Sequence, residues 1–230
     1  MIACIHQPEH MPWMGLIHKI AISDIYIVLD NVQFKKNYFE NRNKIYTKQG
    51  LQWLTVPVKI QGHIQKKFFE IEPMDNWKRK YLATLSQTYA KAPYLKDIKE
   101  IISVIDLYEG NYLADLNLEI IQMICRLIGI GTKIIRAKDV IADGKKTELL
   151  INLLNQVEAN EYIVGKSGFD YMDLDRFDAN GIRLIVHKFN HPRYKPFNYD
   201  KMTDFPSIID VIANLGIPSV KKCIYENNKT

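Results

Sequence analysis

The sequence is poor in the features that mark secreted, membrane-spanning and disulfide-stabilised proteins. Its three cysteines, Cys4, Cys125 and Cys223, lie far apart and form no CxxC pair, which indicates a reducing compartment rather than a disulfide framework. No stretch approaches the roughly 18 uninterrupted apolar residues of a membrane span. Residues 1–10 lack the charged and apolar regions of a signal peptide. We therefore expect a cytoplasmic protein without a membrane-spanning segment.

Long runs of one charge are also absent. Basic side chains outnumber acidic ones by 31 to 26, and lysines occur in pairs rather than in blocks. A net charge of +5 suits phosphates or other anionic ligands, but it does not by itself predict a nucleic-acid-binding protein. With 230 residues, of which 47% are hydrophobic, the chain is long enough to form one large domain with a substantial core.

What is present is an alternation of strand and helix patterns. Residues 2–5 and 25–29 have the pattern of buried strands around a helical pattern in 13–21, which predicts a parallel β-α-β unit. A strand pair is expected around 48–50 and a further strand in KKFFEIEP, residues 66–73. The expected helices and later strands are as follows: helices at 76–90, 95–105, 111–128, 145–159, before 180 and at 205–216; strands at 132–137, 161–165 and 182–189.

This order predicts an α/β fold, layered, with a mostly parallel sheet and flanking helices. We expect a single domain over residues 1–230, with a seam between two halves near 93–110.

The segment HQPEHMPWMG, residues 6–15, follows the first predicted strand and is the strongest candidate for a site. Ligands of open parallel sheets bind at the carboxyl ends of the strands, and the following helix N-terminus suits phosphate or carboxylate. His6 and His10 could stabilise developing charge, with Gln7 and Trp13 contacting a substrate. The alternative is structural: His6 caps the strand and Trp13 plugs the sheet edge.

A metal site is the other alternative for this segment. The spacing H-x3-H would place both rings on one side of a helix, but Pro8 and Pro12 disfavour a regular helix. No further His or Cys ligand lies nearby. We therefore expect no metal.

Two further groups of polar residues follow strands. Asp30 ends the second predicted strand and should face the same crevice as His6. Gln33, Asn41 and Arg42 come next and supply amide and guanidinium groups that suit a sugar, a nucleotide or a carboxylate. A solvated turn is the alternative interpretation of these residues.

GKSGFDYMD, residues 165–173, follows a later strand, and its candidate contacts are Lys166, Ser167 and Tyr171. It lacks the order of residues in a P-loop. Tyr194, after the last strand, belongs to a basic and aromatic segment that could close over the site; a surface connection stiffened by prolines is the alternative.

The opening strand, loop and helix are similar to the nucleotide-binding unit of the nucleotidylyl transferases and pantothenate synthetases. That unit has two histidines around a glycine, spaced H-x2-H. Here the spacing is H-x3-H, and prolines stand in place of the glycine. The likeness concerns the fold and transfers no site residue.

Several motifs together resemble the WbqC-like protein family. They run in order through nearly the whole chain: HQPEHMPWMG at 6–15, SDIYIVLDNVQF at 23–34, NRN at 41–43, LTVPV at 54–58, YAKAPY at 89–94, SGFDYMD at 167–173 and SIIDVIANLG at 207–216. The resemblance implies a link to O-antigen and other surface polysaccharides, and a glycine transferase role has been proposed for the family. It supplies no established catalytic residues.

These two lines give one hypothesis and one rival. The hypothesis is an aminoacyl (glycine) transferase that forms an amide on an amino sugar or its nucleotide-linked form. His6 would be the general base or oxyanion stabiliser, Asp30 would orient it, and Arg42 would hold a carboxylate or phosphate. The amino acid is either activated by ATP or delivered already activated, as a thioester or an aminoacyl-tRNA. Apart from this tRNA donor, we expect no nucleic acid as a partner. The rival is a non-catalytic protein that binds sugar nucleotides or assists assembly. The oligomeric state is not predicted.

Overall fold

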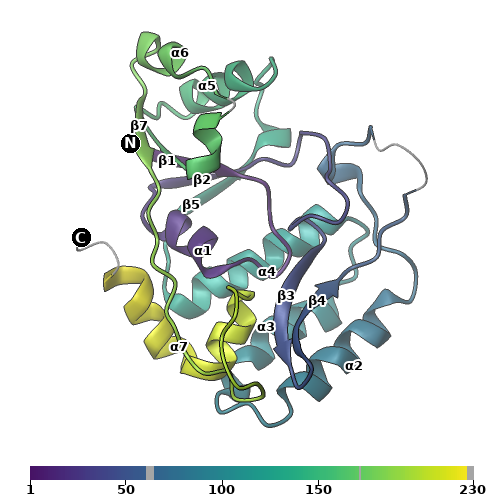
Figure 1. Ribbon diagram of the computed structural model, residues 1–230. Helices are drawn as coiled ribbons and strands as arrows, with labels where there is room; N and C mark the ends of the chain where they lie inside the picture. Colours follow the sequence, from purple (N-terminus) through teal and green to yellow (C-terminus); the bar gives the residue numbers. More distant parts are fainter. Residues whose placement is uncertain (61–64, 171, 227–230) are drawn as a thin grey trace.

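The computed structural model describes residues 1–60, 65–170 and 172–226. At its centre lies a five-stranded parallel sheet with the order β5-β2-β1-β6-β7 (Figure 1). The strands are β1 (Ile2–His6), β2 (Ile25–Val28), β5 (Lys133–Arg136), β6 (Glu161–Val164) and β7 (Arg183–Val186). The predicted α/β fold with a mostly parallel sheet is confirmed. Within the described ranges no helix is both long enough and apolar enough to cross a membrane.

Helices cover both faces of the sheet because successive strand residues point to opposite faces. Cys4 and Tyr26 belong to the larger hydrophobic cluster, with α1 (Met14–Ala21), α4 (Leu113–Ile128) and α7 (Ile208–Glu226). Ala3 and Ile5 belong to a second cluster on the other face, with α5 (Thr147–Gln156) and α6 (Leu174–Ala179). Figure 1 shows α5 and α6 above the sheet and the other three helices below it. Burial on both faces explains why the strands are almost uniformly apolar.

The strand order defines where the topology reverses. From β1 the chain moves outward to β2 and β5, and it then crosses to β6 and β7 on the other side of β1. The reversal therefore lies between β1 and β6. In sheets of this kind the ligand crevice lies outside the carboxyl ends of the strands at that point. The segments that follow β1 and β6 are HQPEHMPWMG and GKSGFDYMD, both of which the sequence singled out.

A β-hairpin and two more helices extend the larger face. The hairpin pairs β3 (Arg42–Thr47) with β4 (Gly50–Thr55), as predicted. Helices α2 (Trp77–Tyr89) and α3 (Leu95–Leu107) agree with the expected ranges. The strand expected in residues 66–73 is wrong: Phe68–Glu70 forms a 3-10 turn, η1. The Glu70 carboxylate accepts the backbone N–H of Lys67 at 2.8 Å, and this bond curls the segment out of an extended conformation.

The last helix does not end where the glycine signal predicted. Gly216 has a φ of +78°, which interrupts the regular helix, but a second helical stretch continues to Glu226. The interruption also makes room for an aromatic ring, since a Cβ at Gly216 would lie 2.6 Å from Cδ1 of Tyr94. At the other end, Ser207 Oγ accepts the backbone N–H of Ile209 at 3.4 Å, in keeping with the predicted cap.

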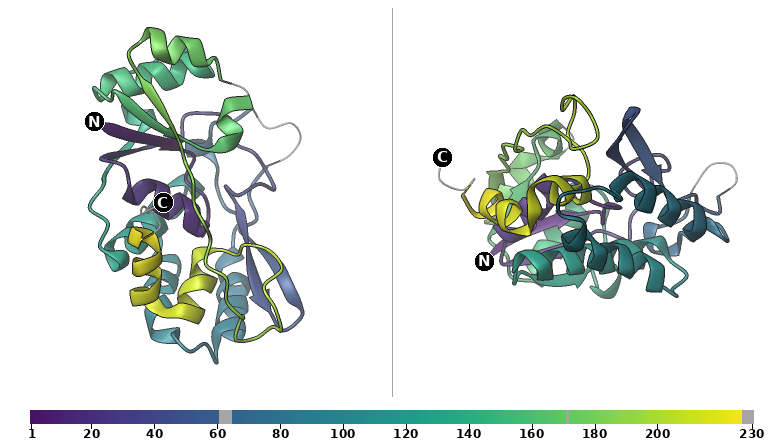
Figure 2. Two further views of the ribbon diagram at one scale, coloured as in Figure 1. Left: turned by 60° about the vertical axis from the view of Figure 1, so that its left-hand side comes forward. Right: turned by 90° about the horizontal axis from the view of Figure 1, so that it is seen from below.

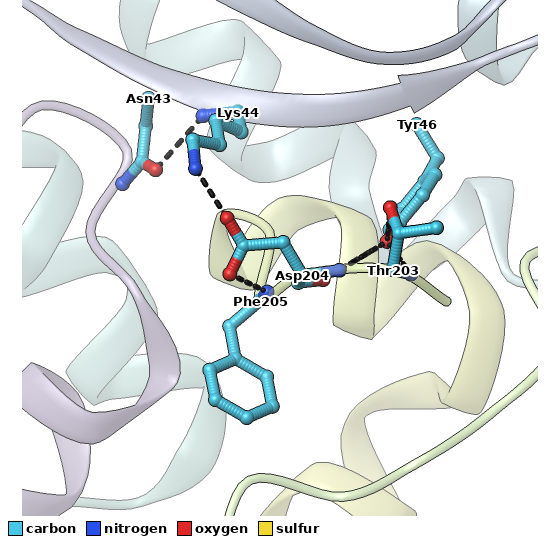
Figure 3. A network of polar contacts seen from close by, with 6 residues as sticks. All are labelled: Asn43, Lys44, Tyr46, Thr203, Asp204 and Phe205. Atoms are coloured by element: carbon cyan, nitrogen blue, oxygen red, sulfur yellow. Dashed lines mark hydrogen bonds and ion pairs between the residues drawn. The ribbon is translucent and has the colours of Figure 1, made fainter.

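The connection from β7 to α7, residues 187–207, runs along the molecule and contacts the hairpin (Figure 2). Figure 3 shows how it is attached. Lys44 Nζ forms an ion pair with Asp204. The Tyr46 hydroxyl accepts the backbone N–H of Thr203 at 2.6 Å and that of Asp204 at 3.0 Å. The larger hydrophobic cluster contains residues from both predicted halves, Met11 and Ile45 as well as Ile121 and Ile212, and we propose on this ground that the chain folds as one domain.

Candidate functional site

His6 is the last residue of β1 and opens the candidate site. Its Nδ1 lies 2.9 Å from the carbonyl oxygen of Gln7, which indicates that Nδ1 carries the proton and donates it to that carbonyl. Its Nε2 lies 3.9 Å from Oε1 of Glu9, too far for a hydrogen bond. The side chain keeps 38% of its surface exposed. His6 is therefore partly exposed, and its Nε2 is available as a proton acceptor.

The protonation states of His6 and Glu9 are shifted in opposite directions. Desolvation, followed by the positive charge of Lys19, lowers the pKa of His6 to about 4. Desolvation raises the pKa of Glu9, whose side chain is almost fully buried, to about 8. At neutral pH the imidazole is therefore neutral and the carboxyl holds its proton. Paired groups whose pKa values are pushed apart are typical of general acid–base sites.

Helix α1 places two more titratable side chains under the same loop. Lys19 is buried, and its ammonium donates to the carbonyl oxygen of Ile5 at 3.2 Å. Desolvation lowers the pKa of Lys19. His18 Nδ1 lies 2.9 Å from Nε2 of His187, which follows β7, and desolvation together with His18 lowers the pKa of His187 to about 3. Within the described part of the chain no group of three or more His, Cys, Asp or Glu is arranged to hold a metal ion.

Sequence reasoning missed Glu9, His18 and Lys19 as members of the site. The available signal was the composition of the helix: in MGLIHKIA only His18 and Lys19 have polar side chains, and a helix that is apolar almost all round is expected to be buried together with its polar residues. Glu9 belongs to the segment HQPEHMPWMG, but the sequence does not show that its carboxyl group is buried. Only the structure does, where Glu9 is 6% exposed.

His10 is a structural residue. It is fully buried, its Nδ1 lies 2.8 Å from Oδ1 of Asn117, and its Nε2 lies 2.6 Å from the Tyr81 hydroxyl. Asn117 also donates to the carbonyl oxygens of Pro8 at 2.7 Å and Glu40 at 2.8 Å. Since both ring nitrogens of His10 are bonded inside the core, neither nitrogen is free for a substrate, and the side chain holds the loop. We assign it this role in place of the predicted catalytic one.

Asp30 contacts an arginine rather than His6. One carboxylate oxygen accepts from Nε of Arg136 at 2.5 Å, and the other accepts the backbone N–H of Lys138 at 3.0 Å. Arg136 is also paired with Asp115. Across the described ranges no hydrogen bond or ion pair joins Asp30 to His6, so the predicted orientation of His6 by Asp30 has no contact to support it. Asp30 instead links the ends of β2 and β5.

The three candidates after β2 lie in different settings. Gln33 is exposed and its backbone pairs with that of Lys67. Asn41 is buried, where its amide donates to the carbonyl oxygen of Val56 at 3.1 Å, so it shapes the turn before β3. The Arg42 guanidinium lies 4.0 Å from the centre of the Trp53 ring, a stacked arrangement.

The remaining candidates lie in the loop after β1, in the segment after β6 and in the connection from β7 to α7. Trp13 is half-buried and packs edge-on against Phe189, with ring centres 6.0 Å apart, as the plug interpretation expects. Lys166 is exposed in the 3-10 helix that also contains Ser167, at the end of β6. The Tyr194 hydroxyl donates to Asp210 at 2.9 Å. Tyr171 lies outside the described residues.

The sequence matches the WbqC-like protein family over residues 7–222. The chain belongs to this family. The WbqC-like chain is also 35% identical over 218 residues to a protein of Mycobacterium tuberculosis, "Uncharacterized protein Rv1507c", with 92% of this chain and 93% of that protein covered. No solved structure matches it, so the expected likeness to the nucleotidylyl transferases stays a prediction.

Proposed function

We propose that this WbqC-like protein is a cytoplasmic transferase that joins an aminoacyl group, glycyl in the first instance, to the amine of a nucleotide-linked amino sugar. The observation that carries the proposal is the pair of His6 and Glu9 at the carboxyl end of β1, one neutral and accessible, the other protonated. The resemblance to a family linked with surface polysaccharides supports an amino sugar as the acceptor.

Each group of the pair has one task in this reaction. The sugar amine attacks the carbonyl carbon of the activated amino acid, and Nε2 of His6 accepts the proton that the amine releases. A C–N bond forms, and the bond between the carbonyl carbon and the leaving phosphate, ribose oxygen or thiolate breaks. The Glu9 carboxyl protonates or hydrogen-bonds that leaving group. Lys166, on the segment after β6, contacts an anionic part of the substrate.

The donor must be activated, because a free carboxylate does not acylate an amine. ATP would supply an adenylate and release pyrophosphate; an aminoacyl-tRNA or a thioester would arrive already activated. These donors differ in what they release, so the assay distinguishes them.

The first experiment is ATP–pyrophosphate exchange with the purified protein and glycine, followed by mass spectrometry of UDP-linked amino sugars incubated with ATP and glycine. We expect glycine-dependent exchange and a product heavier by one glycyl residue, both lost in His6→Ala. Lys133→Ala, an exposed change at the opposite end of β5, is the matched control and should keep full activity.

Two other results are informative. Transfer from glycyl-tRNA without exchange would retain the transferase and replace ATP by an activated donor. Binding of a UDP-amino sugar without transfer from any donor, and with equal affinity in His6→Ala, would contradict the proposal and favour the non-catalytic binding protein.

A further inference from the structure

A groove with no part in the proposed reaction lies between the β3–β4 turn, the end of α2 and residues 195–200. It contains a cavity of about 520 Å³ and an adjoining one of about 320 Å³. The two share the lining residues Lys48, Gln87, Thr88 and Asn198. Together they form one recess, within the size range of small-molecule sites. None of these residues belongs to the parallel sheet.

The wall of the groove is held in place by specific contacts. The Tyr199 ring stacks on Tyr46 with ring centres 5.9 Å apart. It also lies against Gly50, where a Cβ would approach the ring to 3.2 Å. The Asn198 amide donates to the carbonyl oxygen of Tyr46 at 2.7 Å. Because these side chains are already fixed, little ordering would be required of them on binding.

The net charge of the groove is positive. Lys48, Lys91 and Lys195 line it, against a single carboxylate, that of Asp200. All three lysines are exposed, and no ion pair between described residues engages any of their ammonium groups. Three ammonium groups around one recess favour an anionic ligand. They are too few and too local for the extended phosphate track of a nucleic acid.

Neutral polar side chains occupy most of the rest of the groove. Gln49, Gln52 and Thr84 line the smaller cavity, and Gln87 and Thr88 line both cavities. Amides and hydroxyls each offer both donors and acceptors, which match the hydroxyl groups of a sugar chain better than a peptide or a lipid. We propose that this groove binds an acidic oligosaccharide, a sugar chain that carries carboxylate groups.

The test is calorimetric titration with tetragalacturonate, using maltotetraose as a neutral chain of equal length and inorganic phosphate as a simple anion. We expect measurable binding of tetragalacturonate alone, weakened by added salt. The double variant Lys91→Gln, Lys195→Gln should weaken it about tenfold or more, because two charge-assisted contacts are lost. Lys133→Gln removes an exposed charge elsewhere and should leave the affinity unchanged.

Several results would overturn the proposal: no binding of tetragalacturonate, equal binding of maltotetraose or phosphate, or equal affinity in the double variant. Backbone amide shifts in NMR spectra provide the location. We expect them at 48–50, 87–91 and 195–200, and shifts confined to other segments would contradict the assignment. Glycyl transfer is measured separately, so failure of one proposal leaves the other intact.

Discussion

Replacement of Asn117 by alanine tests how the segment HQPEHMPWMG is held. Asn117, on α4, is fully buried and joins three separate parts of the chain: the imidazole of His10 and the carbonyl oxygens of Pro8 and Glu40. The change Asn117→Ala leaves all three partners buried without it. An unsatisfied buried polar group costs about 1–3 kcal/mol, so we expect a loss of about 3–6 kcal/mol of unfolding free energy after partial relaxation.

This loss is a large fraction of the total stability, since the unfolding free energy of native proteins is about 5–15 kcal/mol. Urea unfolding followed by tryptophan fluorescence is the assay, and the midpoint should fall by about 1.5 M or more at an unchanged slope. Asn180→Ala is the matched control: that amide donates to the carbonyl oxygen of Arg176 at 2.7 Å, but on the surface. It should cost below about 1 kcal/mol.

A cost below about 1 kcal/mol at Asn117 would refute the reasoning. It would mean that water reaches the three partners or that the loop is not held by this side chain. The loop geometry assigned to His6 would then lose its structural basis.

The remaining predictions concern pH, backbone conformation and thiol reactivity. Transfer activity should follow a bell-shaped pH profile. The neutral form of His6 is lost as the pH falls through its pKa of about 4, and the acid form of Glu9 is lost as the pH rises through its pKa of about 8. Activity that stays constant from pH 5 to pH 10 would contradict the assignment of this pair. Gly50→Ala should lower the melting temperature more than Gly181→Ala, because both have positive φ but only the first Cβ would meet a ring. A thiol reagent should modify Cys223 first, since the other two cysteines are buried; faster reaction of either of those thiols would show that the core opens readily.

The order of elements could be derived from the sequence because local patterns report local structure. The apolar runs at residues 2–5 and 25–29 and the helical spacing in 111–128 correspond to β1, β2 and α4. The prediction of a strand at 66–73 was wrong because its alternating hydrophobic pattern is outweighed by a hydrogen bond in which the Lys67 N–H donates to the Glu70 carboxylate. Such a bond competes with the extended conformation and leaves no trace in hydrophobic periodicity.

The sequence indicated where the candidate site lies, but it did not indicate the contacts of every residue in it. The position of His6 follows from the rule that ligands bind at the carboxyl ends of parallel strands. The role of His10 does not, because its partners Asn117 and Tyr81 are 107 and 71 residues away in the sequence and meet it only in the folded core. The role of Asp30 could not be predicted for the same reason, since its partner Arg136 belongs to β5, which lies beside β2 only after folding.

The sequence by itself determined the family, the parallel α/β sheet and the segment that opens the candidate site, since all of these depend on patterns within short stretches of chain. Only the tertiary structure decided which polar side chains are buried together. Burial raises the pKa of Glu9 and lowers those of His6 and Lys19 by removing water from around the charged forms. The atoms that exclude the water come from segments far apart in the sequence, because β1 lies between β2 and β6 and α1 packs in one hydrophobic cluster with α4 and α7.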